Sequence, residues 1–202
     1  MANTTITRTP SGAGNKRTWT LSFWMKKCEN GDSPTFFINT DGSGQYGFYF
    51  LFGPSDEIKF GDYTTGGNWN PEFLTNRKFR DNNAWYHFVL TWDTTQSTES
   101  DRIKLYVNGV QETSFSTSTY PSQNYQGYWN GANQFYIGSY INTSNYFNGC
   151  MSHIHFIDGT AYDASAFGQT NSTTGEWSIK TSPSVTYGTN GFFILKDGNS
   201  VT

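Results

Sequence analysis

Cysteine is nearly absent from the sequence, which has only Cys28 and Cys150 among its 202 residues. Two thiols cannot form the multi-disulfide framework of a small secreted scaffold, and they lack the paired spacing of a zinc knuckle. We expect both thiols to be free and mostly buried. A disulfide between them is the alternative, because Cys28 ends one expected strand and Cys150 begins another, and that bond would require an oxidising compartment.

Charge is also scarce. Asp, Glu, Lys and Arg make up 14% of the residues and the net charge is −3, against about 25% charged residues in an average protein. Such a chain has no broad basic surface for phosphate contacts, which argues against a nucleic-acid partner. No apolar run approaches the length of a membrane span, and residues 1–17 contain no apolar signal-peptide core. We therefore expect cytoplasmic synthesis and no membrane insertion.

Helical stripes are hard to find, whereas 17 Phe, 13 Tyr and 7 Trp supply half of the hydrophobic residues. Short aromatic and Thr-rich runs, separated by Gly, Asn, Asp and Ser, indicate many strands. The nine strands that we expect span residues 18–27, 35–39, 47–52, 57–60, 85–93, 102–107, 134–138, 150–157 and 191–195. Several alternate large apolar with polar residues, which is typical of stacked antiparallel sheets with one solvated face each. The sequence predicts an all-β, antiparallel two-sheet sandwich in one domain.

Turn signals and long polar segments separate these strands. Asn108 and Gly109 predict a tight hairpin because both residues tolerate positive φ. Asp163 can cap one helical turn that Gly168 ends. We expect loops at residues 61–84, 94–101, 113–133 and 169–189. Connections longer than about 12 to 15 residues are usually functional or disordered.

Separated motifs occur in a recognisable order. They are WYHFVLTWD at residues 85–93, KLYVNG at residues 104–109, NGCM at residues 148–151 and AYD at residues 161–163. This order resembles the concanavalin A-like jelly-roll family, which includes laminin G-like and pentraxin-like domains. The resemblance implies a single jelly-roll domain over residues 1–202.

A closer resemblance covers nearly the whole chain. It rests on RTPS at residues 8–11, AGN at 13–15, FRD at 79–81, DTTQ at 93–96, DR at 101–102, HFIDG at 155–159 and SAFG at 165–168. These motifs look like those of jelly-roll structural proteins from tailed phages of marine bacteria, which implies a virion surface component, either a fibre or a head decoration. Related chains often continue past the final strand, so a native chain truncated here after Thr202 stays an open alternative.

Catalytic patterns are missing from the expected strands. A jelly-roll glycosidase would use two carboxyls roughly 5 to 9.5 Å apart, but the neighbours Asp56 and Glu57 would point to opposite faces of a strand. Glu99 and Asp101 lie in a polar turn, where solubilising charge is the simpler interpretation. No G-x-S-x-G elbow occurs, and no Ser or Cys partner is evident for any histidine. We therefore expect no enzymatic activity.

Three histidines are candidate metal ligands. His153 and His155 would lie on one face of a strand, about 7 Å apart, and His87 on another strand could add a third ligand. Outward polar positions on a sheet explain all three without a metal, and this is the interpretation that we favour.

Calcium is the alternative cofactor. Asp41, Asp62 and Asp158 with neighbouring Asn residues supply the oxygen ligands that this ion prefers, but no fixed-spacing loop occurs and Asp-Gly pairs are usually plain turns. We expect no obligatory cofactor, and the sequence assigns no ligand set.

The loop at residues 113–133 interleaves aromatic rings with amides. A sugar stacks its apolar face on Trp or Tyr while Asn and Gln bind its hydroxyls. The candidate ligand-binding residues are Trp69, Asn124, Tyr125, Tyr128, Trp129 and Asn130. Two alternatives remain at this stage, because the same rings are suited to subunit contacts or to pinning long loops onto the sandwich.

Together these observations predict a non-enzymatic structural or adhesive module located on the virion and made in the host cytoplasm. Its partners would be other capsid or tail proteins, cell-surface glycans, or further copies of itself in a homo-oligomer. A free-standing, lectin-like carbohydrate-binding module is the alternative, and a glycan-active enzyme without the usual motif comes third.

Overall fold

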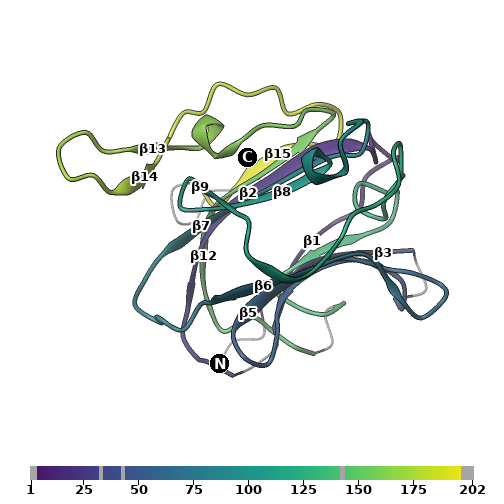
Figure 1. Ribbon diagram of the computed structural model, residues 1–202, viewed down its shortest axis with the longest axis horizontal. Helices are drawn as coiled ribbons and strands as arrows, with labels where there is room; N and C mark the ends of the chain where they lie inside the picture. The colour runs from purple at the N-terminus through teal and green to yellow at the C-terminus, as the bar shows by residue number, and fades with distance from the viewer. Residues whose placement is uncertain (1–3, 32–33, 42–43, 142–143, 197–202) are drawn as a thin grey trace.

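The computed structural model describes residues 4–31, 34–41, 44–141 and 144–196. Two large antiparallel sheets stack face to face as a sandwich (Figure 1). This arrangement confirms the predicted all-β jelly-roll class. No helix in these ranges is long and apolar enough to span a membrane.

The first sheet has seven strands in the order β1-β11-β3-β4-β5-β6-β10. Their bounds are β1 Ile6–Arg8, β11 Phe135–Ile137, β3 Thr35–Thr40, β4 Gly47–Phe52, β5 Glu57–Tyr63, β6 Trp69–Lys78 and β10 Phe115–Thr119. The second sheet has six strands in the order β15-β12-β2-β7-β8-β9. These are β15 Phe192–Ile194, β12 Gly149–Asp158, β2 Thr18–Lys27, β7 Tyr86–Asp93, β8 Ile103–Val107 and β9 Val110–Glu112.

A hairpin of β13 (Gly168–Thr170) and β14 (Trp177–Ile179) forms a third, two-stranded sheet. Two single-turn 3-10 helices complete the elements, η1 at Glu99–Asp101 and η2 at Ala164–Ala166. As predicted, Asp163 caps η2, its carboxylate accepting a hydrogen bond from the Ser165 N–H at 2.8 Å. The Asn108-Gly109 hairpin is also confirmed, because both residues have positive φ and Val107 pairs with Val110.

The core between the sheets consists mainly of aromatic rings. Alternation along β2 turns Trp19, Leu21, Phe23 and Met25 inward, and all four are completely buried. Trp19 stacks on Trp92 of the neighbouring β7 with ring centroids 5.0 Å apart. Facing them, β4 contributes Phe48, Phe50 and Phe52, which are also completely buried.

The outer face of the six-stranded sheet is covered, so the expectation of a solvated face is wrong for this sheet. Residues between β12 and β15 cross it (Figure 1), and Val89 and Ile157 of the sheet form a second small core with Phe167 and Ala164. The polar outward residue Thr20 is completely buried, and its hydroxyl donates to the Thr160 carbonyl at 2.8 Å. The covering segment is distant in sequence from most of the strands it contacts, so alternation within those strands does not indicate that their outer residues are buried.

All nine expected strands are present, and residues 18–27 and 47–52 coincide with β2 and β4. Three expected loops were wrong in part, since residues 61–84 contain the whole of β6 and residues 113–133 contain β10. Residues 169–189 likewise contribute to β13 and β14. The thiols are free, as predicted, but both Cys28 and Cys150 are exposed, which corrects the expectation of burial. Cys150 lies opposite Lys26 rather than Cys28 in the β2-β12 register.

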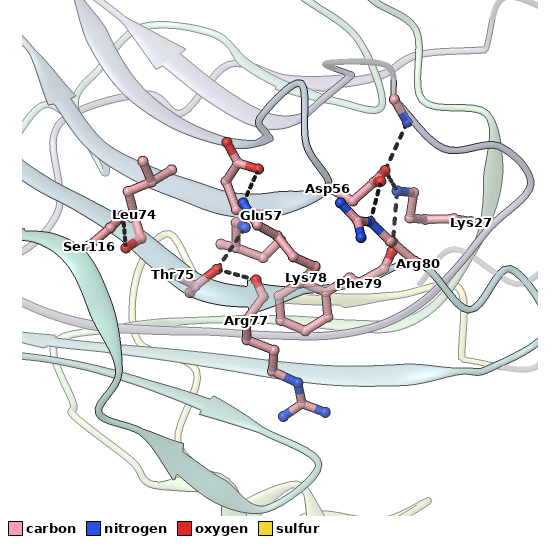
Figure 2. Close-up of polar contacts among 12 residues, drawn as sticks. Lys27, Asp56, Glu57, Leu74, Thr75, Arg77, Lys78, Phe79, Arg80 and Ser116 are labelled. Atoms are coloured by element: carbon pink, nitrogen blue, oxygen red, sulfur yellow. Dashed lines mark hydrogen bonds and ion pairs between the residues drawn. The ribbon is translucent and has the colours of Figure 1, made fainter.

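Buried ion pairs hold one end of the sandwich together. Lys27 of β2 reaches across to Asp56 in the β4-β5 turn at 2.5 Å, and both side chains are at least 95% buried. Figure 2 shows Lys27 and Arg80 pointing at the same Asp56 carboxylate. Burial alone would raise the pKa of Asp56, but hydrogen bonds from Lys27 and from the Gly31 N–H hold it below its usual value. This clamp joins the two sheets.

Candidate functional site

Aromatic side chains gather on the outer face of the seven-stranded sheet. Because Phe48 and Phe50 of β4 point into the core, Tyr49 between them points outward. Tyr63 at the end of β5 and Trp69 at the start of β6 are paired in register. We call the cluster of Tyr46, Tyr49, Tyr63, Trp69 and Tyr140 the aromatic face.

The rings of the aromatic face contact one another in a continuous row. Tyr140 stacks on Tyr49 at 6.2 Å between centroids, and Tyr49 meets Trp69 edge-on at 5.6 Å. Tyr63 lies 5.7 Å from Trp69 and stacks on Tyr46 at 6.1 Å. Such mutual packing restricts each ring before any ligand arrives.

The row borders a shallow pocket of about 410 Å³. Its lining residues are Thr35, Gln45, Tyr49, Leu51, Tyr63, Trp69, Tyr140 and Asn145. The pocket therefore combines ring faces with amide and hydroxyl groups, and none of these lining residues carries a carboxyl group. Burial, together with the neighbouring Tyr140, raises the pKa of Tyr49, so its phenol stays neutral and donates to the Gln45 carbonyl at 2.9 Å.

One ion pair lies beside the aromatic face. Lys59 Nζ lies over the ring of Trp69, 4.1 Å from its centroid, and pairs with Glu72 at 2.8 Å. Because Glu72 neutralises the cation, the ion pair adds little net charge next to the pocket. The rings of the aromatic face can stack on the apolar face of a neutral sugar, and the amides and hydroxyls of the pocket can bind the sugar's hydroxyls.

Of the candidate residues taken from the sequence, the structure places Trp69 in this row and two others in the interior. Trp129 is completely buried and stacks on Phe135 at 4.7 Å, so its ring has no face for a ligand. Asn130 is also completely buried, where its amide donates to Asp158 at 2.7 Å. The expectation that both contact a ligand is wrong, because composition alone does not distinguish a ring that pins a loop from one that is displayed.

Two of the three remaining loop candidates, Tyr125 and Tyr128, lie beside Asp62. The Tyr125 hydroxyl donates to Asp62 at 2.9 Å, and the Tyr128 N–H donates to the same oxygen at 3.1 Å. Tyr125 also reaches the Asn70 carbonyl at 3.2 Å, next to Trp69 in β6. Asn124 is exposed, and its backbone N–H donates to the Thr94 carbonyl at 2.7 Å. The loop is thus anchored next to the aromatic face, with only parts of Tyr125 and Tyr128 accessible.

The candidate metal ligands do not converge. Asp62 points into the interior, and burial raises its pKa to about 7 against the opposing hydrogen bonds from Tyr125 and Tyr128. Asp158 instead accepts from the N–H groups of Asn15 and Asn190. Within the described ranges, no group of three or more His, Cys, Asp or Glu residues could hold a metal ion.

Two of the histidines are buried rather than outward and solvated. His87 and His155 lie beneath the C-terminal cover of the six-stranded sheet, each 1% exposed. Burial lowers the pKa of each to about 3, so both rings are neutral near pH 7.

Sequence reasoning missed four members of the aromatic face, Tyr46, Tyr49, Tyr63 and Tyr140. Residues 47–52, GFYFLF, are apolar at almost every position, so the pattern alone does not say which rings face outward. The signal that was available is the strict alternation within residues 47–52 once Phe48 is assigned to the core.

Comparison with known proteins agrees with the sandwich fold. A family model described as the Concanavalin A-like lectin/glucanases superfamily matches residues 2–166. No curated protein sequence matches the chain.

Solved structures with a similar fold include the native heptameric SAP-like pentraxin from Limulus polyphemus, with a TM-score of 0.50 and 14% identity over 77% of this chain and 70% of that one. The CBM40 of the Ruminococcus gnavus IT-sialidase has a TM-score of 0.50 and 11% identity, over 79% of this chain and 95% of that one. A Trypanosoma rangeli sialidase has a TM-score of 0.50 and 15% identity, over 74% of this chain and 22% of that one. At these identities the similarity concerns the fold.

Proposed function

The chain belongs to the concanavalin A-like lectin/glucanases superfamily, and from this premise we propose that it is a non-catalytic module that binds glycans through the aromatic face. The observation that carries the proposal is the pocket of about 410 Å³ in which Tyr49, Tyr63, Trp69 and Tyr140 lie beside amide and hydroxyl groups. Sugar rings have apolar faces for the aromatic rings and hydroxyls for the amides.

Two features favour binding over catalysis. The pocket's lining residues include no carboxyl group, whereas glycoside hydrolysis normally uses a pair of them. The similar CBM40 domain is by its name a carbohydrate-binding module. Incubating the protein with laminarin or agarose tests this part, since reducing ends released above a heat-inactivated control would contradict it.

A glycan array tests the binding site. We expect Trp69→Ala to weaken strongly the array signals that depend on the aromatic face, because it removes the ring at the centre of the row. Val110→Ala is the matched control, since Val110 is 70% exposed and lies on the other sheet. Equal array signals from the unaltered chain and Trp69→Ala would reject the aromatic face as the binding surface.

We propose further that the chain is a single domain displayed on the particle of a tailed phage, as a fibre or head-decoration component made in the host cytoplasm. The motif resemblance at residues 8–15, 79–81 and 155–168 supports this role. Many copies on one particle would turn weak glycan contacts into tight attachment, and contacts with other capsid or tail proteins would hold each copy.

Electron microscopy of particles labelled with an antibody against this chain tests the virion role. Label on capsid or tail supports it. Particles without label, from cells that contain the free protein, would instead identify a free-standing carbohydrate-binding module.

A further inference from the structure

A second pocket, of about 290 Å³, lies on the opposite side of the molecule from the aromatic face. Its lining comes from β14, from β2 and β12 of the six-stranded sheet, and from the residue just before β7. Its lining residues are Trp24, Trp85, Ser152, Trp177, Ser178 and Ile179. We call it the three-tryptophan pocket.

Contacts with His87 hold two rings of this pocket, Trp177 and Trp24, in place. Trp177 Nε1 donates to His87 Nδ1 at 2.9 Å, and the other nitrogen of His87 lies 2.9 Å from the Ser22 hydroxyl. Since Nδ1 accepts from Trp177, the neutral His87 carries its proton on Nε2 and donates it to Ser22. Trp24 stacks on His87 with centroids 4.8 Å apart and 12° between the planes.

Glycines leave room for the Trp177 ring. Gly109 in the β8-β9 turn and Gly168 in β13 both touch the ring so closely that a Cβ on either would collide with it. Trp177 is therefore positioned by His87 on one edge and by these two glycines. A site with rings held in advance loses little side-chain entropy on binding.

The pocket presents apolar surface and hydroxyls without charge. Trp85 is 42% exposed, which makes it one of two large hydrophobic side chains exposed within the described ranges. No lining residue is ionisable, and Ser152 and Ser178 add hydroxyls that can accept further hydrogen bonds. The volume lies at the lower end for ligand pockets, so it suits a single small ring.

From these observations we infer that the three-tryptophan pocket is a second binding site, which takes one neutral pyranose unit. Rings and hydroxyls without charge match a neutral sugar, which has an apolar face and hydroxyl edges. Trp177, Ser178 and Ile179 lie beyond residue 166, where the family match ends, so half of the pocket's lining comes from the C-terminal cover outside that match. The inference stands apart from the aromatic face, since the two sites share no residue.

The seven tryptophans make the two sites separately observable. Trp19, Trp92 and Trp129 are completely buried in the core, Trp69 reports the aromatic face, and the other three report the pocket. Titrating the full chain with methyl glycosides of glucose, galactose and N-acetylglucosamine, followed by the indole N–H resonances, is therefore the test. At least one glycoside should shift the Trp85 and Trp177 resonances saturably and leave the core three in place.

Two variants test whether the binding occurs in the three-tryptophan pocket. Trp85→Ala should weaken the binding reported by Trp177 about tenfold or more, because it removes the exposed stacking surface, whereas Val110→Ala should leave the affinity unchanged. Shifts at Trp85 and Trp177 without a shift at Trp69 would support this pocket while the proposed function of the aromatic face fails.

Two results would overturn the inference. In one, glycosides shift only Trp69 or no tryptophan at all. In the other, 3-methylindole shifts Trp85 and Trp177 while no glycoside does, and the pocket would then take an apolar side chain of a protein.

Discussion

Two buried carboxylates, Asp56 and Asp62, differ in the partners that surround them. Asp56 faces the Lys27 ammonium, and the pKa of Asp56 is lowered despite its burial. Asp62 receives only the Tyr125 hydroxyl and the Tyr128 N–H, its Oδ1 has no hydrogen-bond partner among the described residues, and burial raises its pKa to about 7. At Asp56 the cation and hydrogen bonds together outweigh burial, whereas at Asp62 the two neutral donors lower the pKa less than burial raises it.

Replacing Lys27 with Met removes the cation over Phe52 but keeps an unbranched side chain that is only one atom shorter. We expect a loss of about 3 kcal/mol or more in the free energy of unfolding, because Asp56 remains as a buried carboxylate without its nearest counter-charge. Urea denaturation measures the loss. Lys104→Met is the control, since Lys104 pairs with a half-exposed Asp101, and it should cost less than about 1 kcal/mol. Similar losses in the two variants would contradict the clamp.

The titration of Asp62 makes stability depend on pH. Its pKa is about 7 in the folded chain, against the ordinary value of 3.8 for an aspartate. The stability that this proton contributes is fully present below 3.8 and is lost as the pH rises to about 7. Asp62→Asn keeps an oxygen that can accept the bonds of Tyr125 and Tyr128 but cannot titrate. Its free energy of unfolding should therefore rise relative to the unaltered chain between about pH 4 and about pH 7.5. His87 and His155 are present in both proteins and their titration cancels in the difference, so a difference that stays constant with pH would refute the shift.

At the scale of elements, the strands that sequence predicts best are those with a clear alternation or a bounded aromatic run. β2 alternates Trp19, Leu21 and Phe23 with Thr and Ser, and it begins and ends where the sequence indicates. β6 was missed because Pro71 and a polar end, Thr75 to Lys78, hide its alternation. The candidate site was predicted only at Trp69, because the neighbouring rings of the aromatic face come from β4, β5 and two loops that are brought together by the fold.

The β13-β14 hairpin was not predictable, because its position depends on Trp177 packing against distant residues. Gly168→Ala places a methyl group where the Trp177 ring lies, so we expect the hairpin to loosen and the chain to lose about 1 to 3 kcal/mol of stability. Limited proteolysis should then cut faster within residues 169–176. The control is Gly12→Ala, since a Cβ there meets nothing within 4 Å. Unchanged cleavage in Gly168→Ala would show that the ring does not hold the hairpin.

For the whole molecule, the two pockets lie on the outer faces of opposite sheets. A chain with one site on each side can join two glycan strands, whereas a chain with one site cannot. This arrangement follows from the fold, because stacked sheets turn their outer faces in opposite directions.

Cross-linking of a soluble polysaccharide identified on the glycan array tests the pair of sites together. We expect the unaltered chain to raise light scattering at intermediate protein concentrations and to lower it again in excess, because excess protein occupies each strand singly. Trp69→Ala and Trp85→Ala should each still bind the polymer without raising the scattering. If either single variant cross-links as well as the unaltered chain, the two-site arrangement is incorrect.

The outermost strands of both sheets are short. β1, β9 and β15 have three residues each and β10 has five. Short borders offer few free N–H and C=O groups to a neighbouring chain, which limits strand addition between molecules. Neighbouring copies can therefore pack side by side with little edge-to-edge β-pairing, which would otherwise lead to fibrils. An assembly that contains many copies of this protein at close spacing requires this property.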